Sequence, residues 1–92
     1  MKSFGEYIRR VREEKELPLR KVAAALDIDT SILSKIERNE RVATKEMIPI
    51  LVETLERPEK EIEIEFIQSV VESNLGDLKY LKDGLKEILK TL

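Results

Sequence analysis

Apolar residues recur every three or four positions along most of this chain, which is the spacing of one buried helix face. At the N-terminus, Ser3 and Glu6 form a capping box, in which the serine side chain accepts a hydrogen bond from the glutamate amide. The stripe that follows consists of Phe4, Ile8 and Val11, with Tyr7 flanking it. The pattern therefore predicts a first helix over about residues 4–15.

Two shorter apolar stripes come next and predict two short helices, joined by about three residues. Pro18 suits the start of the second helix, where its missing N–H is not needed. Asp29 is a good N-cap for the third helix, which should reach residue 36 or 37. The apolar positions of the pair are Leu19, Val22, Ala23, Leu26, Ile28, Leu33 and Ile36.

The close spacing of these two helices is that of a helix-turn-helix. Such a crossing needs a small residue where the helices touch, and Ala23 supplies it. The turn needs a residue that tolerates the left-handed conformation, and Asp27 is one of the few types besides glycine that does.

Two further helices are expected before residue 76. Thr44 should cap the fourth, whose stripe is Ile48, Leu51, Val52 and Leu55. Pro49 lies too deep in that helix to be harmless, so a kink or a shifted start is expected. Pro58 begins the fifth helix, whose stripe is Ile62, Phe66, Ile67, Val70 and Val71.

The C-terminal segment allows two interpretations. Gly76 and Asp77 are stop and start signals, as a C′ residue and an N-cap, which favours a separate last helix. Alternatively, a 3,4 spacing continues from Ile64 to Leu92 and would form four heptads with Asn74 as one polar seam position. Gly76 and Gly84 would each cost that rod about 1 kcal/mol, so a break near Gly76 is preferred.

The third helix has an unusual polar side. With Leu33 and Ile36 buried, its free face presents Thr30, Ser31, Ser34 and Lys35. Short hydrogen-bonding side chains let a helix enter the major groove and meet base edges, and a lysine reaches guanine O6 or N7. Ile32 lies at the edge of this face, where packing is favoured over base contact.

Composition removes several kinds of chemistry. The chain has no Cys and no His, so disulfides, structural zinc and imidazole catalysis are excluded, and neither a cofactor nor a metal is expected. Glu61, Glu63 and Glu65 alternate around a helix and predict a solvated face. No nucleophile with a neighbouring base stands out, so an enzyme is not expected.

Charge and hydropathy indicate the setting. Residues 1–45 carry a net charge of +3 and residues 46–92 a net charge of −5, which suggests a basic working end and an acidic distal end. No apolar run reaches membrane-spanning length and the N-terminus lacks a signal-peptide pattern, so a cytoplasmic protein without a membrane partner is expected.

Residues 4–64, and above all the stretch LSKIERNER, resemble the phage Cro/repressor-type, or XRE-like, helix-turn-helix family. The last apolar stripe, outside this match, predicts a C-terminal helical dimerisation extension over residues 66–92. The resemblance itself implies an all-α fold, with a five-helix lambda-repressor-like domain over residues 1–65. It also implies binding of double-stranded operator DNA as a homodimer, in a repressor, a restriction–modification controller or an antitoxin.

Carried over by position, the resemblance implies that Thr30, Ser31, Ser34 and Lys35 face bases and that Arg38, Arg41 and Lys45 meet phosphates. It also implies an ion pair between Arg12 and Glu37. The chain departs from the family at Pro18, Leu19, Asp27 and Asn39. Leu19 removes a frequent contact to DNA, which Arg20 could replace.

The last apolar stripe leaves the partner open. Leu78, Leu81, Leu85 and Ile88 need a cover, because an isolated helix of this length is marginal in water. Dimerisation, alone or combined with folding back, is preferred over folding back on the parent domain alone. A protein-binding antitoxin or assembly adaptor, gripping a partner with this segment, is the main alternative function.

Overall fold

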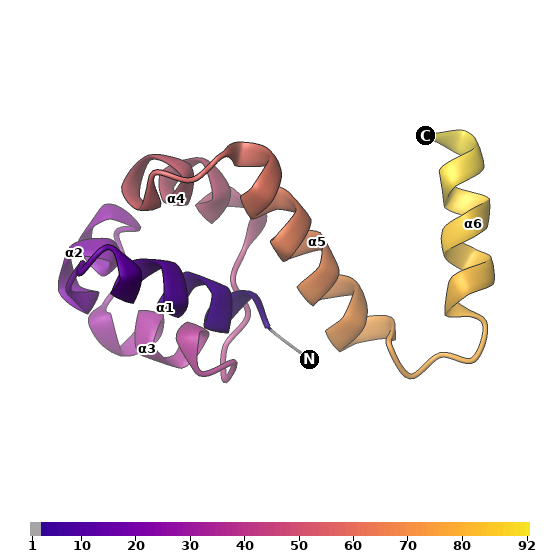
Figure 1. Cartoon of the computed structure of the whole chain (residues 1–92). Helices are drawn as coiled ribbons and strands as arrows, with labels where there is room; N and C mark the ends of the chain where they lie inside the picture. Colours follow the sequence, from indigo (N-terminus) through magenta and orange to yellow (C-terminus); the bar gives the residue numbers. More distant parts are fainter. Residues whose placement is uncertain (1–2) are drawn as a thin grey trace.

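The computed structural model describes residues 3–92, and all the regular structure in that range is helical (Figure 1). A bundle of short helices is followed by one long helix and a separate last one. In chain order they are α1 (Phe4–Glu14), α2 (Leu19–Ala25), α3 (Thr30–Glu37), the 3-10 turn η1 (Lys45–Met47), α4 (Ile48–Leu55), α5 (Glu59–Leu75) and α6 (Leu81–Thr91).

One aliphatic core joins α1, α2, α3, α4 and the first turns of α5. Its fully buried side chains are Ile8, Val11, Val22, Leu33, Leu51, Leu55 and Ile62. These are the positions that the helical periodicity predicts. The all-α fold with a helix-turn-helix is therefore confirmed.

Helices α1 to α4 are each terminated by a non-glycine residue in the left-handed conformation. Asp27 (φ 58°) and Asn39 (φ 63°) do this after α2 and α3, as their residue types predict. Glu16 (φ 55°) and Glu56 (φ 54°) do the same after α1 and α4. Glutamate has no special tolerance for this conformation, so the sequence gives no local signal for those two turns.

Pro49 is accommodated by a shifted start of α4 and not by a kink. Thr44 is the N-cap of η1, and the α-helix proper begins only at Ile48. Pro49 then falls in the first turn of α4, where its missing N–H has no intrahelical partner to lose.

Helix α5 runs past residue 65, where the sequence suggests a domain boundary. The Phe66 ring packs edge-on against Phe4, with centroids 5.2 Å apart. Ser69 Oγ accepts a hydrogen bond from the Phe4 amide at 3.1 Å. The bundle therefore holds α5 at least as far as Ser69.

The C-terminal segment forms two helices, as a break near Gly76 predicts. The predicted signals are nevertheless wrong in detail. Gly76 is the C-cap of α5 in a right-handed conformation (φ −60°), and Asp77 caps nothing, because α6 begins at Leu81 after Tyr80. Leu78 consequently lies in the connection rather than on the last helix.

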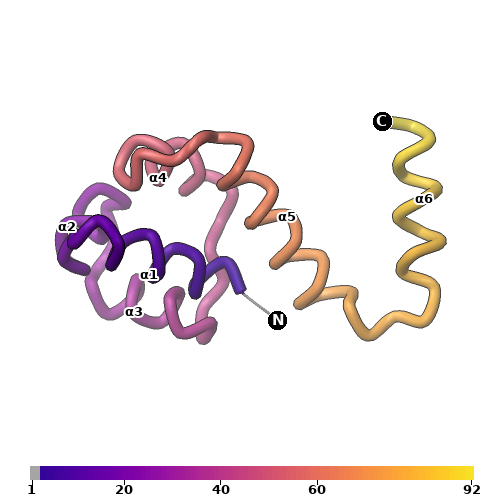
Figure 2. The backbone as a smooth tube through the Cα atoms, in the orientation of Figure 1, coloured from indigo at the N-terminus to yellow at the C-terminus, as the bar shows by residue number. Residues whose placement is uncertain are grey.

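Helix α6 stands apart from the bundle, which the backbone trace makes plain (Figure 2). Its apolar side is uncovered: Leu85 is 36% exposed and Ile88 53% exposed. The fold-back arrangement is therefore absent from the described chain.

Candidate nucleic-acid interface

The turn between α2 and α3 fixes the direction of α3. The amide of Ile28 donates to the carbonyl of Ala23 at 3.0 Å, and Asp27 takes the left-handed conformation between them. Ala23 is buried, so the two helices approach closely at this point. Asp29 occupies the N-cap position of α3, although its side chain makes no capping hydrogen bond.

Helix α3 presents its polar side to solvent. Leu33 and Ile36 are buried in the core, whereas Thr30, Ser31 and Lys35 are exposed and Ser34 is half-buried on the opposite side. Ile32 is half-buried and packs against the core, which agrees with the packing interpretation. The four predicted base-reading residues therefore lie on the free side of one short helix.

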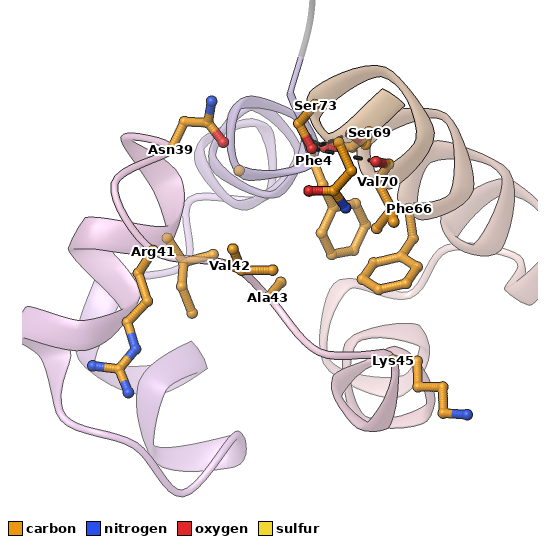
Figure 3. A pocket seen from close by; sticks show the side chains of 13 residues that line it. Phe4, Asn39, Arg41, Val42, Ala43, Lys45, Phe66, Ser69, Val70 and Ser73 are labelled. Carbon is orange, nitrogen blue, oxygen red and sulfur yellow. Dashed lines mark hydrogen bonds between the residues drawn. The ribbon is translucent and has the colours of Figure 1, made fainter. Parts of the chain in front are cut away.

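The predicted phosphate contacts are exposed but differ in their surroundings. Arg20 lies in the first turn of α2. Arg38, the C-cap of α3, is not free, because its Nε lies 3.2 Å from the Glu40 carboxylate. Arg41, in the loop after α3, and Lys45, the first residue of η1, extend in different directions (Figure 3). The structure thus groups Arg38 and Arg41 near the end of α3 and sets Lys45 apart, on η1.

Arg12 and Glu37 are joined across α1 and α3. Arg12 Nε and Nη2 donate to the two Glu37 carboxylate oxygens at 2.8 and 3.0 Å, and Nη1 donates to the Leu17 carbonyl at 2.9 Å. Their side chains are only 12% and 5% exposed. The hydrogen bond to Glu37 raises the pKa of Arg12 above its ordinary value, so the guanidinium stays protonated.

Gly5 fixes the same end of α3, and the apolar pattern does not predict it. A Cβ at Gly5 would stand 1.9 Å from the Ile36 carbonyl oxygen. Only glycine therefore allows the start of α1 to touch the last turn of α3. A glycine within an otherwise regular helix stripe is the sequence signal that could have found this contact.

A second polar contact missed by sequence reasoning ties α1 to α5. The Tyr7 hydroxyl donates to Glu61 at 2.5 Å, and Arg57 makes two hydrogen bonds of 2.9 Å to the same carboxylate. Desolvation and the Glu61 contact raise the pKa of Tyr7 to about 12, while the hydrogen bond from Arg57 lowers the pKa of Glu61. Glu61 and Glu65 are therefore half-buried rather than fully solvated, whereas Glu63 is exposed as predicted.

A hollow of about 290 Å³ lies between the loop after α3 and helix α5 (Figure 3). Phe4, Phe66, Val70 and Ala43 give it an apolar floor, and Val42 stands at its rim, 79% exposed. In the close-up, the guanidinium of Arg41 and the ammonium of Lys45 point away from this hollow (Figure 3). Both cations are therefore available to a ligand outside the hollow.

The comparison with known families agrees with this geometry. A family model described as Helix-turn-helix matches residues 8–62, which is more than half of the chain and includes all of α2 and α3. The chain belongs to this helix-turn-helix family. No curated protein and no solved structure matches it.

The family match confirms the Cro/repressor-type resemblance of the sequence. The protein is therefore a member of a DNA-binding regulatory family. The match ends at Ile62, within α5, so it covers neither the end of α5 nor α6. Among residues 3–92, none of the helices is both long and apolar enough to cross a membrane.

Proposed function

We propose that this helix-turn-helix protein is a sequence-specific transcriptional regulator that binds a palindromic operator as a homodimer, with α3 in the major groove. The observation that carries the proposal is the free side of α3. Four small or flexible polar side chains lie there, and the opposite side of the helix is fixed by buried Leu33 and Ile36. A rigid helix with short donors and acceptors is suited to reading base edges.

Phosphate contacts supply affinity in this proposal, and base contacts supply discrimination. Arg38 and Arg41 follow α3 directly, so they would meet the backbone beside the groove that α3 enters. Arg20 and Lys45 would contact the backbone further away. The net charge of −2 limits attraction to DNA in general.

Dimerisation is assigned to the segment after Gly76. Leu78, Leu85 and Ile88 are exposed and Leu81 is half-buried in the single chain. Burying a leucine fully is worth about 1.5–3 kcal/mol, so these four side chains could support association after its entropic cost. The two copies of α3 would then read half-sites about 34 Å apart.

A protein-binding adaptor or antitoxin is the second candidate, and the same exposed segment favours it. Binding of the purified protein to duplex DNA at stepped salt concentrations separates the two functions. A regulator binds alone, and its affinity falls steeply with salt. Failure to bind any duplex, together with a stable complex with a different protein, would replace the proposal with the adaptor.

A further inference from the structure

Helix α5 has two apolar sides, and only one of them packs on the bundle. Ile62 and Phe66 lie on the packed side. On the other side, Ile64, Ile67 and Leu75 are 44%, 55% and 40% exposed, with half-buried Val71 between them. These four residues, spaced by three or four positions, form the outer stripe of α5.

The outer stripe continues into the junction with α6. Leu75 is also part of the lining of a hollow of about 500 Å³ between the end of α5 and α6. The other apolar side chains that line this hollow are Leu78, Tyr80, Leu81, Leu85 and Ile88. A continuous apolar surface of this kind on a small protein marks an interaction site.

Charge distinguishes the two helices that carry this surface. Helix α5 contains five Glu and one Lys and is strongly acidic. Helix α6 contains three Lys, one Asp and one Glu. Lys82 and Lys86 lie one turn apart beside the apolar side of α6. The basic helix is therefore a better neighbour for α5 than a second α5 would be.

Gly84 is a further sign of a close neighbour. It lies inside α6, where a glycine costs about 1 kcal/mol relative to alanine. Apart from its chain neighbours and the adjacent backbone of α6, a Cβ placed there meets no atom of the described chain within 4 Å, so no contact within one copy requires the glycine. Gly84 also lines the hollow between the end of α5 and α6.

We propose that α6 of one copy lies along the outer stripe of α5 of a second copy, and that the second copy does the same in return. The inference rests on the proposed dimer and specifies how it forms. A reciprocal exchange satisfies two-fold symmetry. The exchange covers the outer stripe of α5 and the apolar side of α6 at once. It places the lysines of α6 beside the glutamates of α5, and it brings the helices into contact at Gly84.

Cysteine cross-linking tests the exchange directly, because the chain contains no Cys. Copies carrying only Ile67→Cys are mixed with size-tagged copies carrying only Leu85→Cys, and the mixture is oxidised. Each copy has a single thiol, so a bond between positions 67 and 85 must join two copies. A mixture of Ser73→Cys with Leu85→Cys is the matched control, because Ser73 is exposed and lies on the opposite side of α5, beside Ser69 and Val70.

The exchange predicts a 67–85 product at least about fivefold more abundant than the 73–85 product, because a disulfide forms only between closely facing positions. It also predicts that folded Ile67→Glu sediments as a monomer at micromolar concentration. Cross-linking of Leu85 only to Leu85, with Ile67→Glu still dimeric, would overturn the exchange and leave the proposed dimer standing. A wild-type protein that sediments as a monomer would overturn both.

Discussion

Arg12 on α1 and Glu37 at the end of α3 face each other as a two-pronged ion pair, with both carboxylate oxygens engaged. The third arm of the guanidinium holds the Leu17 carbonyl, in the connection to α2. One largely buried arginine therefore connects α1, the end of α3 and the segment that leads into α2. The orientation of α3 depends on this pair as well as on apolar packing.

Removal of Arg12 should be costly. Arg12→Ala leaves the Glu37 carboxylate buried without its partner, which should lower the free energy of unfolding by roughly 3–5 kcal/mol. Arg9→Ala is the control, because Arg9 pairs with Glu13 on the surface and should change stability by less than about 1 kcal/mol. Urea denaturation measures both. If the two variants unfold alike, the pair does not stabilise the fold.

Lys35 and Arg41 should have different effects on DNA binding. Lys35→Ala should relax the preference at one base pair by about 1–3 kcal/mol. Arg41→Ala should weaken binding to all duplexes similarly. It should also reduce the slope of the logarithm of the binding constant against the logarithm of the salt concentration by about one. Titration of matched and single-mismatch duplexes at several salt concentrations separates the two effects. Equal loss of preference from both variants would refute the division of roles.

Glu40 should restrain binding through Arg38. Their ion pair is exposed, so its strength is modest, but it holds the guanidinium that is expected to contact phosphate. Glu40→Gln should tighten binding to every duplex by a factor of about two to five, corresponding to roughly 0.5–1 kcal/mol. Glu46→Gln, which also removes one exposed acidic group, is the charge control. An equal gain in both variants would show that net charge, not Arg38, is responsible.

Tyr7 should make the fold sensitive to high pH. Its pKa is raised to about 12 in the folded chain from an ordinary value of 10.0. The unfolded chain therefore loses this proton first, and stability that is fully present below pH 10 is lost as the pH rises to 12. The loss attributable to Tyr7 is at most about 3 kcal/mol.

Tyr7→Phe supplies the control for that pH dependence. It cannot ionise, so its stability should fall less steeply than that of the wild type between pH 10 and 12. Denaturant titrations at fixed pH values measure the difference. Parallel curves for the two proteins would show that the Tyr7–Glu61 contact does not perturb ionisation in solution.

Local signals in the sequence predict the helix-turn-helix well. Ala23, Asp27 and Asn39 act through small size or tolerance of the left-handed backbone, and both properties can be read from a residue type. The free side of α3 follows directly from the periodicity of Leu33 and Ile36. These features need no knowledge of distant contacts.

The features that sequence reasoning missed depend on packing between distant segments. Glu61 looks like a surface residue until α5 brings it to Tyr7, which lies 54 positions earlier. The role of Gly5 appears only when α1 meets the carbonyl of Ile36. Asp77 is a plausible N-cap by type, yet a turn delays α6 to Leu81. Residue type alone does not report which competing arrangement packs best.

Selection from randomised duplexes by the wild-type protein tests the central claim most directly. A dimer that reads with α3 should enrich an inverted repeat whose half-site centres lie about 34 Å apart. The same selection with Thr30→Ala, Ser34→Ala and Lys35→Ala combined should lose the enriched sequence while the protein stays folded. Enrichment of one sequence by both proteins, or of none by the wild type, would contradict the assignment of α3 as the reading helix.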